Sequence, residues 1–296
     1  MQQFFYTLLL CGAATTLAAQ PTITAASFPH AGDVFEISTL TDTTSLVTMS
    51  QPLSQTWDFT YLYTESYREE TVGAAADGAN FLDFPNTELL QSITGAFGTA
   101  YVDVTNNSMT RIGGGVELFG FGFVAPYADP HVLQTAPLTF NSQRTDNFDL
   151  RFGEHIDSIP FLRQLLDAAL ASSPLPGGVS PDSIRIKVSG SRLMYNEAHG
   201  TLILYDGNYN VLRQKVCEET NIAIELRIAS PFGGGGFWFD VTGLLTGVVP
   251  LPVPTEFTAV YYDYLAEGYR QPIVRQNVDP DNEQQVRSVE FKGQVQ

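Results

Sequence analysis

The chain has little cysteine. Of its two cysteines, Cys11 lies in an apolar leader, so the mature chain keeps Cys217 alone and no internal disulfide can form. Cys217 lies in the strand-like stretch 211–219, "VLRQKVCEE", without the His or Asn signature of a thiol nucleophile. A small apolar packing residue is therefore a better interpretation than a catalytic thiol.

Positive charge is scarce as well. The chain has 15 Lys and Arg residues and 32 Asp and Glu residues, which gives a net charge of −17. Such an excess of acid repels phosphate backbones and anionic headgroups, which excludes nucleic acid as a partner and disfavours anionic lipid headgroups. The 44% hydrophobic and 12% aromatic content excludes a disordered chain and is enough for one large core or two smaller ones.

Long apolar runs are missing outside the leader. Residues 1–19 contain an apolar run from Phe4 to Leu10, with small residues after it up to Ala19. This layout predicts a cleaved signal peptide, although no Lys or Arg precedes the run. The run is much shorter than the roughly 20 residues of a spanning helix. We therefore expect an exported protein, periplasmic or extracellular, with no transmembrane segment in the mature chain.

Motifs for common chemistries are also missing. The sequence has no G-x-S-x-G elbow, Walker loop or dinucleotide fingerprint. Its histidines, His30, His131, His155 and His199, are scattered and form no zinc-type pair. Three of them stand near a carboxylate, and we interpret these stretches as solvated turns. No cofactor is expected from these patterns.

One acidic stretch suggests a metal. Residues 279–283, "DPDNE", offer hard oxygen ligands of the kind that calcium takes, from Asp279, Asp281, Asn282 and Glu283. The spacing matches no complete EF-hand loop. The alternative interpretation is an acidic turn between two strands.

Alternation of apolar and polar residues dominates what is there. The stretches 183–189, "SIRIKVS", and 221–228, "NIAIELRI", each place their apolar residues on one face, as half-buried strands do. Asp206–Gly207 between two such runs predicts a tight hairpin. The stretch 56–63, "TWDFTYLY", alternates over its whole length. The predicted class is mainly β, with antiparallel sheets in a sandwich or a curved half-barrel.

One segment has helical rather than strand spacing. The apolar residues of 160–172 predict a single amphipathic helix, which the Pro and Gly of 174–178 end. We predict a β-rich N-terminal unit over 20–150 and a helix-led antiparallel β unit over 151–296. The alternative is that both share one core.

Aromatic residues are the candidate ligand contacts. Phe237, Trp238 and Phe239 follow one another, so they cannot all face one side of a strand, and we expect two to pack inward and one to be exposed. Trp57 with its tyrosine neighbours suggests a sugar-binding face, and core packing explains the same alternation equally well.

Five stretches taken in order resemble a family of exported Bacteroidota proteins of unknown activity. They are "ITAASFPHAGDVFEI", "QTWDF", "APLTFNSQRTDNF", "DSIRIKVSGSRLM" with "HGTLILYDGNYNVLRQKV", and "QPIVRQNVDPDNEQQVRSVEFK". The resemblance implies an envelope or secreted protein and carries over no catalytic residue. Relatives often continue into a C-terminal sorting domain of the type IX secretion route, a module that is absent after "SVEFKGQVQ" here.

Three functions fit these observations. We favour a non-enzymatic binding or interaction protein that contacts a glycan, an apolar small molecule or an envelope protein. The first alternative is a carrier that encloses an apolar small molecule or lipid in a half-barrel. The second is a hydrolase that acts on polysaccharide or ester through a pair of carboxyl groups, which would need displaced pKa values in an open cleft.

Overall fold

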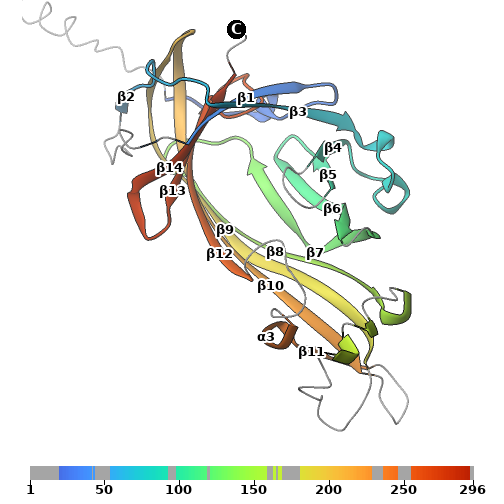
Figure 1. The fold of residues 1–296 in the computed structure, drawn as a ribbon. Helices are drawn as coiled ribbons and strands as arrows, with labels where there is room; N and C mark the ends of the chain where they lie inside the picture. Colours follow the sequence, from blue (N-terminus) through green and yellow to red (C-terminus); the bar gives the residue numbers. More distant parts are fainter. Residues whose placement is uncertain are drawn as a thin grey trace, which may run out of the picture.

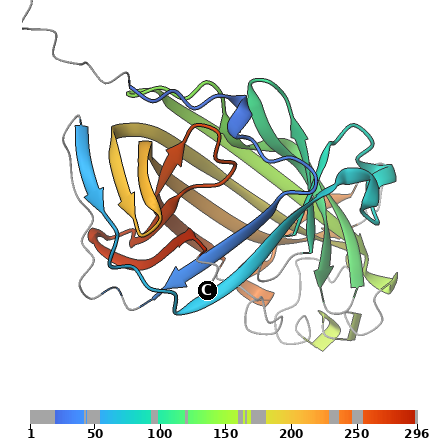
Figure 2. The ribbon, with the colours of Figure 1, turned by 90° about the horizontal axis from the view of Figure 1, so that it is seen from above.

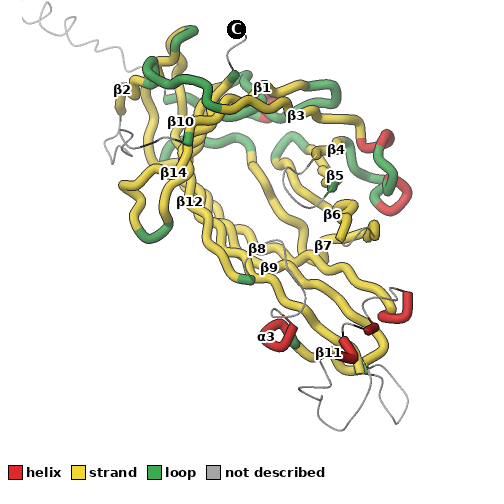
Figure 3. The backbone as a smooth tube through the Cα atoms, viewed as in Figure 1, coloured by secondary structure: helices red, strands yellow, loops and turns green. Residues whose placement is uncertain are grey.

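The fold is dominated by strands, as Figure 3 shows. The computed structural model describes residues 20–41, 43, 54–92, 98–118, 121–158, 163–164, 166–168, 181–228, 236–245 and 255–293. The strands are β1 (Val34–Leu40), β2 (Ser54–Asp58), β3 (Ser66–Ala74), β4 (Leu89–Ser92), β5 (Thr99–Val104), β6 (Ser108–Leu118), β7 (Phe121–Thr135), β8 (Gln143–His155), β9 (Pro181–Leu204), β10 (Gly207–Ile228), β11 (Phe237–Asp240), β12 (Glu256–Ala266), β13 (Val274–Asp279) and β14 (Asn282–Lys292). The short helices are η1 (Ala25–Ser27), η2 (Ala75–Asp77), η3 (Phe81–Asp83), η4 (Ile156–Ser158) and α3 (Thr242–Leu245).

The strands form one sheet that closes on itself. Its order is β10-β12-β13-β14-β1-β3-β4-β5-β6-β7-β8-β9, and β9 pairs with β10 to complete a 12-strand barrel. All neighbours within the ring are antiparallel. The predicted mainly β, antiparallel class is confirmed. Of the predicted arrangements, the curved sheet is the nearer one, and it closes instead of stopping at half a barrel.

The β9–β10 hairpin is the longest element of the fold. Gly207 pairs with Leu204 across a two-residue turn and has a φ of +151°, which favours glycine. The predicted hairpin is present, with Tyr205 and Asp206 as its two turn residues and Gly207 as the first residue of β10. In Figure 1 its strands run alongside β8 and β12, and β11 pairs with the distal end of β10.

Strand β2 extends the sheet beside the other end of β9. It runs parallel to β9, and a Cβ atom at Gly200 would lie 1.9 Å from the carbonyl oxygen of Gln55, so this close pairing requires glycine. The predicted alternation of 56–63 ends at Asp58, whose carboxylate accepts hydrogen bonds from Thr60 N at 2.9 Å and Thr60 Oγ1 at 2.7 Å. This turn changes the register, so Leu62 is buried and Tyr61 is exposed.

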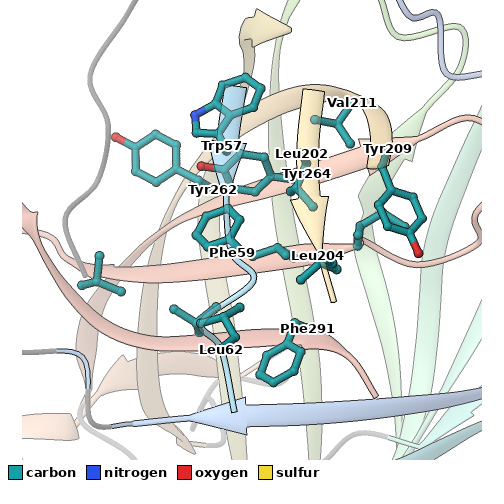
Figure 4. Packing of buried hydrophobic residues seen from close by; sticks show 14 of the residues in the cluster. Trp57, Phe59, Leu62, Leu202, Leu204, Tyr209, Val211, Tyr262, Tyr264 and Phe291 are labelled. Carbon is teal, nitrogen blue, oxygen red and sulfur yellow. The ribbon is translucent and has the colours of Figure 1, made fainter. Parts of the chain in front are cut away.

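The largest apolar cluster lies between β2, the adjoining ends of β9 and β10, and the strands β12, β13, β14 and β1 (Figure 4). We call it the aromatic core. Trp57 packs edge-on against Tyr264 at 5.2 Å between ring centroids, and Phe59 does so at 5.5 Å. Cys217 packs against this cluster, and burial raises the pKa of its thiol, which agrees with a packing role.

The two predicted units share this sheet and this core. Strand β8 crosses the boundary predicted at residue 150, and the aromatic core joins Trp57 of the first unit to Leu202 of the second. Residues of both predicted units thus contribute to one sheet and to one apolar cluster.

The described part of the segment 160–172, residues 163–164 and 166–168, is helical, and Leu166 is buried. The rest of this predicted helix lies outside the described residues. None of the helices in the described ranges is long and apolar enough to cross a membrane.

Candidate functional site

A cavity of about 300 Å³ lies inside the barrel. All ring strands except β5 and β8 contribute to its lining. Figure 2, a view from above, shows the strands that surround this interior. The volume is at the lower end of the range for small-ligand pockets, about 300–1,000 Å³. The cavity is therefore large enough for a small molecule.

The N-terminal segment closes one end of the cavity. Ile23 is buried in an apolar cluster with Leu212 and Leu265, and it pairs with Leu138 through an isolated bridge. The segment is held by Glu267, whose carboxylate accepts a hydrogen bond from Thr24 N at 2.7 Å. The cavity thus has an apolar end.

Basic side chains gather around the cavity. Six of the 15 basic side chains in the whole chain line it, namely Arg68, Arg111, Arg192, Arg270, Arg275 and Lys292. Three acidic side chains, Glu70, Asp263 and Glu290, line it as well. The lining thus carries an excess of three positive charges in a protein whose net charge is −17.

Two of these arginines are neutralised by carboxylates in the lining itself. Arg275 makes a bidentate pair with Asp263, with nitrogen–oxygen distances of 2.6 and 2.8 Å. Arg68 pairs with Glu70 at 2.9 Å and with Glu290 at 3.1 Å. All three acidic groups of the lining therefore face an arginine.

Two more basic groups pair with carboxylates behind the wall. Arg270 Nη1 lies 2.6 Å from Asp33 Oδ1, and Lys292 Nζ lies 2.9 Å from Asp206 Oδ2. These pairs fix the N-terminal segment and the β9–β10 turn to neighbouring elements. The positive charges of Arg270 and Lys292 are therefore neutralised by carboxylates of the protein.

The last two arginines have fewer partners. Arg192, with 8% of its surface exposed, donates from Nη1 to Glu218 Oε2 at 3.2 Å, and its Nε has no acceptor among the described residues. Arg111 interacts with the Tyr127 hydroxyl, has no ion pair in the described ranges, and its Nε also lacks an acceptor there. Each arginine therefore keeps one buried Nε without an acceptor among the described residues, and the buried Asp146 carboxylate lies within electrostatic range of Arg192.

His131 lies between these two arginines, and we call Arg111, His131 and Arg192 the arginine corner. Its ring stacks on Phe148 at 4.3 Å, and Nε2 is 3.7 Å from Glu218 Oε2. Burial, with the positive charges of Arg192 and Arg111, lowers the pKa of His131 to about 2. The imidazole is thus neutral at ordinary pH, and the two guanidinium groups supply the charge.

Tyr261 connects the arginine corner to the rest of the wall. Its ring faces the cavity, with the Arg275 guanidinium 4.3 Å and the Arg192 guanidinium 5.9 Å from its centroid. Burial raises the pKa of its phenol, although both arginines oppose this shift. Tyr261 therefore stays a neutral ring that holds two cations in position.

The sequence-predicted aromatic contacts lie elsewhere. In β11, Phe237 is 65% and Phe239 is 41% exposed, whereas Trp238 is half-buried under the Arg185 guanidinium at 4.1 Å. The expected split is reversed, because two rings are exposed and one is covered. Their role as ligand contacts stays a prediction.

Trp57, the fourth predicted contact, lies in the aromatic core with 1% of its surface exposed. This position agrees with the core-packing interpretation of the alternating aromatics. The role of Trp57 as a ligand contact stays a prediction.

The predicted calcium ligands contact other residues of the protein, and their role as metal ligands stays a prediction. Asp279 accepts a hydrogen bond from Asp281 N at 2.9 Å and pairs with Arg287 at 2.8 Å, while Glu283 receives Lys215 Nζ at 2.7 Å. Asn282 accepts from Gln284 N at 3.3 Å. In the described ranges no group of three or more His, Cys, Asp or Glu side chains is arranged to hold a metal. These residues form a turn between β13 and β14, which is the alternative interpretation.

The expectation of solvated turns is wrong for two histidines. His131 lies in β7 and is 3% exposed, and His199 is half-buried in β9. The arginine corner was missed because its members are far apart in sequence. One available indication was that Arg192 and Arg275 interrupt strand-like stretches in a chain with few basic residues.

These features define a closed antiparallel β fold with a cationic interior. No family model, curated protein or solved structure matches the chain. The resemblance to exported Bacteroidota proteins therefore stays a prediction.

Proposed function

We propose that this protein is a non-enzymatic binding protein that holds a small organic anion inside its barrel. The observation that carries the proposal is the arginine corner, where Arg111 has no ion pair in the described ranges and the buried Nε atoms of Arg111 and Arg192 have no acceptor there. An anion between the two guanidinium groups would supply the missing acceptors.

The physical argument is the cost of a poorly partnered charge. A cation removed from water is strongly destabilising unless a counter-ion and hydrogen bonds replace its hydration. Two arginines on one wall also repel each other, and a shared anion relieves both effects. Guanidinium groups suit carboxylate, sulfate and phosphate groups because their N–H donors match two oxygens at once.

The charged lining favours an anion over the fully apolar ligand of the carrier alternative. An apolar molecule would remove water from six basic and three acidic side chains and return no hydrogen bond to them. The volume of the cavity supports the binding part of that alternative, and the charged lining favours a different kind of ligand.

The leader supports an exported location for this binding protein. Residues 1–19 have the layout of a signal peptide and lie outside the described residues. Export would place the anion-binding barrel in the periplasm or outside the cell.

Calorimetric titration tests the proposal. The panel pairs each acid with a neutral analogue: benzoate with benzyl alcohol, octanoate with octanol, and succinate with 1,4-butanediol. The titrations are made in about 150 mM salt, where exterior charge is screened beyond about 8 Å. We expect at least one acid to bind with a Kd below about 1 mM and its neutral partner to bind at least about tenfold more weakly.

Matched variants locate the binding. Arg111→Gln should raise the Kd of the bound acid by about tenfold or more, since a charged hydrogen bond is lost. Arg287→Gln removes an arginine from an exposed pair with Asp279 and should change the affinity less than twofold. Absence of binding by all three acids, or equal binding of acids and neutral partners, would overturn the proposal.

A further inference from the structure

On two strands of the wall, β12 and β6, the lining residues change from polar to apolar along the barrel axis. On β12, Tyr261 and Asp263 are followed by Leu265, and on β6, Met109 precedes Arg111. The antiparallel pairings from β6 through β7, β8, β9 and β10 to β12 make β6 run opposite to β12. Reading β12 forward and β6 backward therefore moves in the same axial direction, from polar residues to apolar ones.

From this arrangement we infer that the ligand is an acidic amphiphile, a molecule with one acid group and an apolar chain. The acid group lies at Arg111 and Arg192, and the chain extends along the wall toward Leu265. The inference rests on the proposed function and specifies its ligand class.

The apolar end is continuous across neighbouring strands. Leu133 on β7 lines the cavity and packs with Met109, and β7 runs parallel to β12, so Leu133 lies on the apolar side of His131. Leu265 and Ile23 meet in the cluster that closes this end. A chain that leaves the arginine corner in this direction meets apolar side chains from three strands and from the N-terminal segment.

The opposite wall does not compete for the acid group. There, Arg68 is held by Glu70 and Glu290, and Lys292 is held by Asp206. Arg275 is likewise held by both oxygens of Asp263. Among the described residues that line the cavity, Arg111 and Arg192 are the cations whose buried Nε has no acceptor.

The volume limits the length of the chain. At about 30 Å³ for each group the size of a water molecule, the cavity of about 300 Å³ holds roughly ten such groups. An acid group takes about three of them, which leaves space for a chain of roughly seven carbon atoms.

A homologous series of straight-chain acids tests the inference. Calorimetry with acetate, butanoate, hexanoate, octanoate and dodecanoate should show a rise in affinity of about fourfold for each added methylene. The rise should level off beyond octanoate, where the chain fills the cavity. Octanol should bind at least about tenfold more weakly than octanoate.

Two variants separate the chain from the acid group. Leu133→Gln, which places a polar group on the apolar wall, should flatten the dependence on chain length and leave acetate binding within twofold. Leu193→Gln, which replaces an exposed leucine of β9 next to Arg192, is the matched control and should keep the full dependence. Circular dichroism melts confirm that each variant is folded.

The outcomes distinguish the two proposals. If the wild-type protein binds the acids with an affinity that is independent of chain length, the amphiphile inference fails and the anion-binding function stands. If none of the acids in this series or in the first panel binds, both fail. A steep rise with chain length that Leu133→Gln leaves unchanged would also overturn the inference, because the chain would then lie elsewhere.

Discussion

The two faces of β12 look onto two different interiors. Val260, Tyr262 and Tyr264 face the aromatic core, and the alternate residues Tyr261 and Asp263 face the cationic cavity. Both interiors contain tyrosine rings beside arginine. The aromatic core is nonetheless closely packed, whereas the cavity keeps open volume.

The difference between two buried arginines shows what separates these interiors. Arg213 in the aromatic core has a carboxylate oxygen of Glu197 at 2.5 Å, and the rings of Trp57 and Tyr262 lie 5.6 and 5.1 Å from its guanidinium carbon. Arg192 has Glu218 at 3.2 Å, and one ring, Tyr261, within 6 Å. The first lies among the rings of the aromatic core, and the second lines the cavity. Burial of an arginine alone therefore does not identify a binding site.

The strongest test of this comparison is the aromatic core itself. Trp57→Ala should destabilise the protein by about 3–5 kcal/mol, since it removes a fully buried indole and leaves a void. Urea unfolding measures the loss. The control is Trp238→Ala on β11, where a half-buried ring and its contact with Arg185 should cost about 1 kcal/mol. Equal losses for the two variants would show that the aromatic core does not hold the fold together.

A change in the cavity wall should have a smaller effect on stability. Asp263→Asn keeps the shape of the side chain and removes the charge opposite Arg275, for an expected loss of about 2 kcal/mol. The same variant leaves Arg275 without its carboxylate partner in the cavity wall, so octanoate should bind more tightly. Asp279→Asn, in an exposed pair with Arg287, is the matched control and should change stability by less than about 1 kcal/mol. Weaker octanoate binding in Asp263→Asn would contradict a cavity selected for anions.

The smallest expected effect depends on pH. Burial and the two arginines lower the pKa of His131 to about 2, so the unfolded chain binds a proton below about pH 6.5 that the folded protein does not bind. The contribution of His131 to stability is therefore complete above pH 6.5 and falls as the pH drops. Between pH 6.5 and 5.5 the loss should be about 1 kcal/mol.

Unfolding measured at both pH values checks this sign. His131→Gln should lose about 1 kcal/mol less than the wild type over that interval, whereas His155→Gln, at an exposed position, should follow the wild type. A His131→Gln variant with the same pH dependence as the wild type would mean that His131 is not held neutral at the arginine corner.

Much of the fold could be predicted because it depends on local patterns. The stretch 221–228 buries Ile222, Ile224, Leu226 and Ile228, as its alternation predicts. The prediction for 56–63 failed after Asp58, because a side chain that caps its own turn outweighs a continuing pattern. The candidate site could not be predicted in the same way. Arg111 and His131 come from the consecutive strands β6 and β7, whereas Arg192 comes from β9, which β8 and the segment after it separate from them in the chain.

Local chemistry was enough to establish the class of the fold, the hairpin at Asp206–Gly207 and the strongly acidic character of the chain, since period-two burial, turn geometry and charge are properties of short stretches or of composition. Three-dimensional closure decided the rest. The sequence of β12 predicts two different faces. It does not show which face packs in the core and which lines the cavity, because both faces carry aromatic residues. Pairing of β1 with β14 joins the two ends of the described chain in the ring, and the ring brings Arg111 and Arg192 to one wall of an interior that neither stretch of sequence contains.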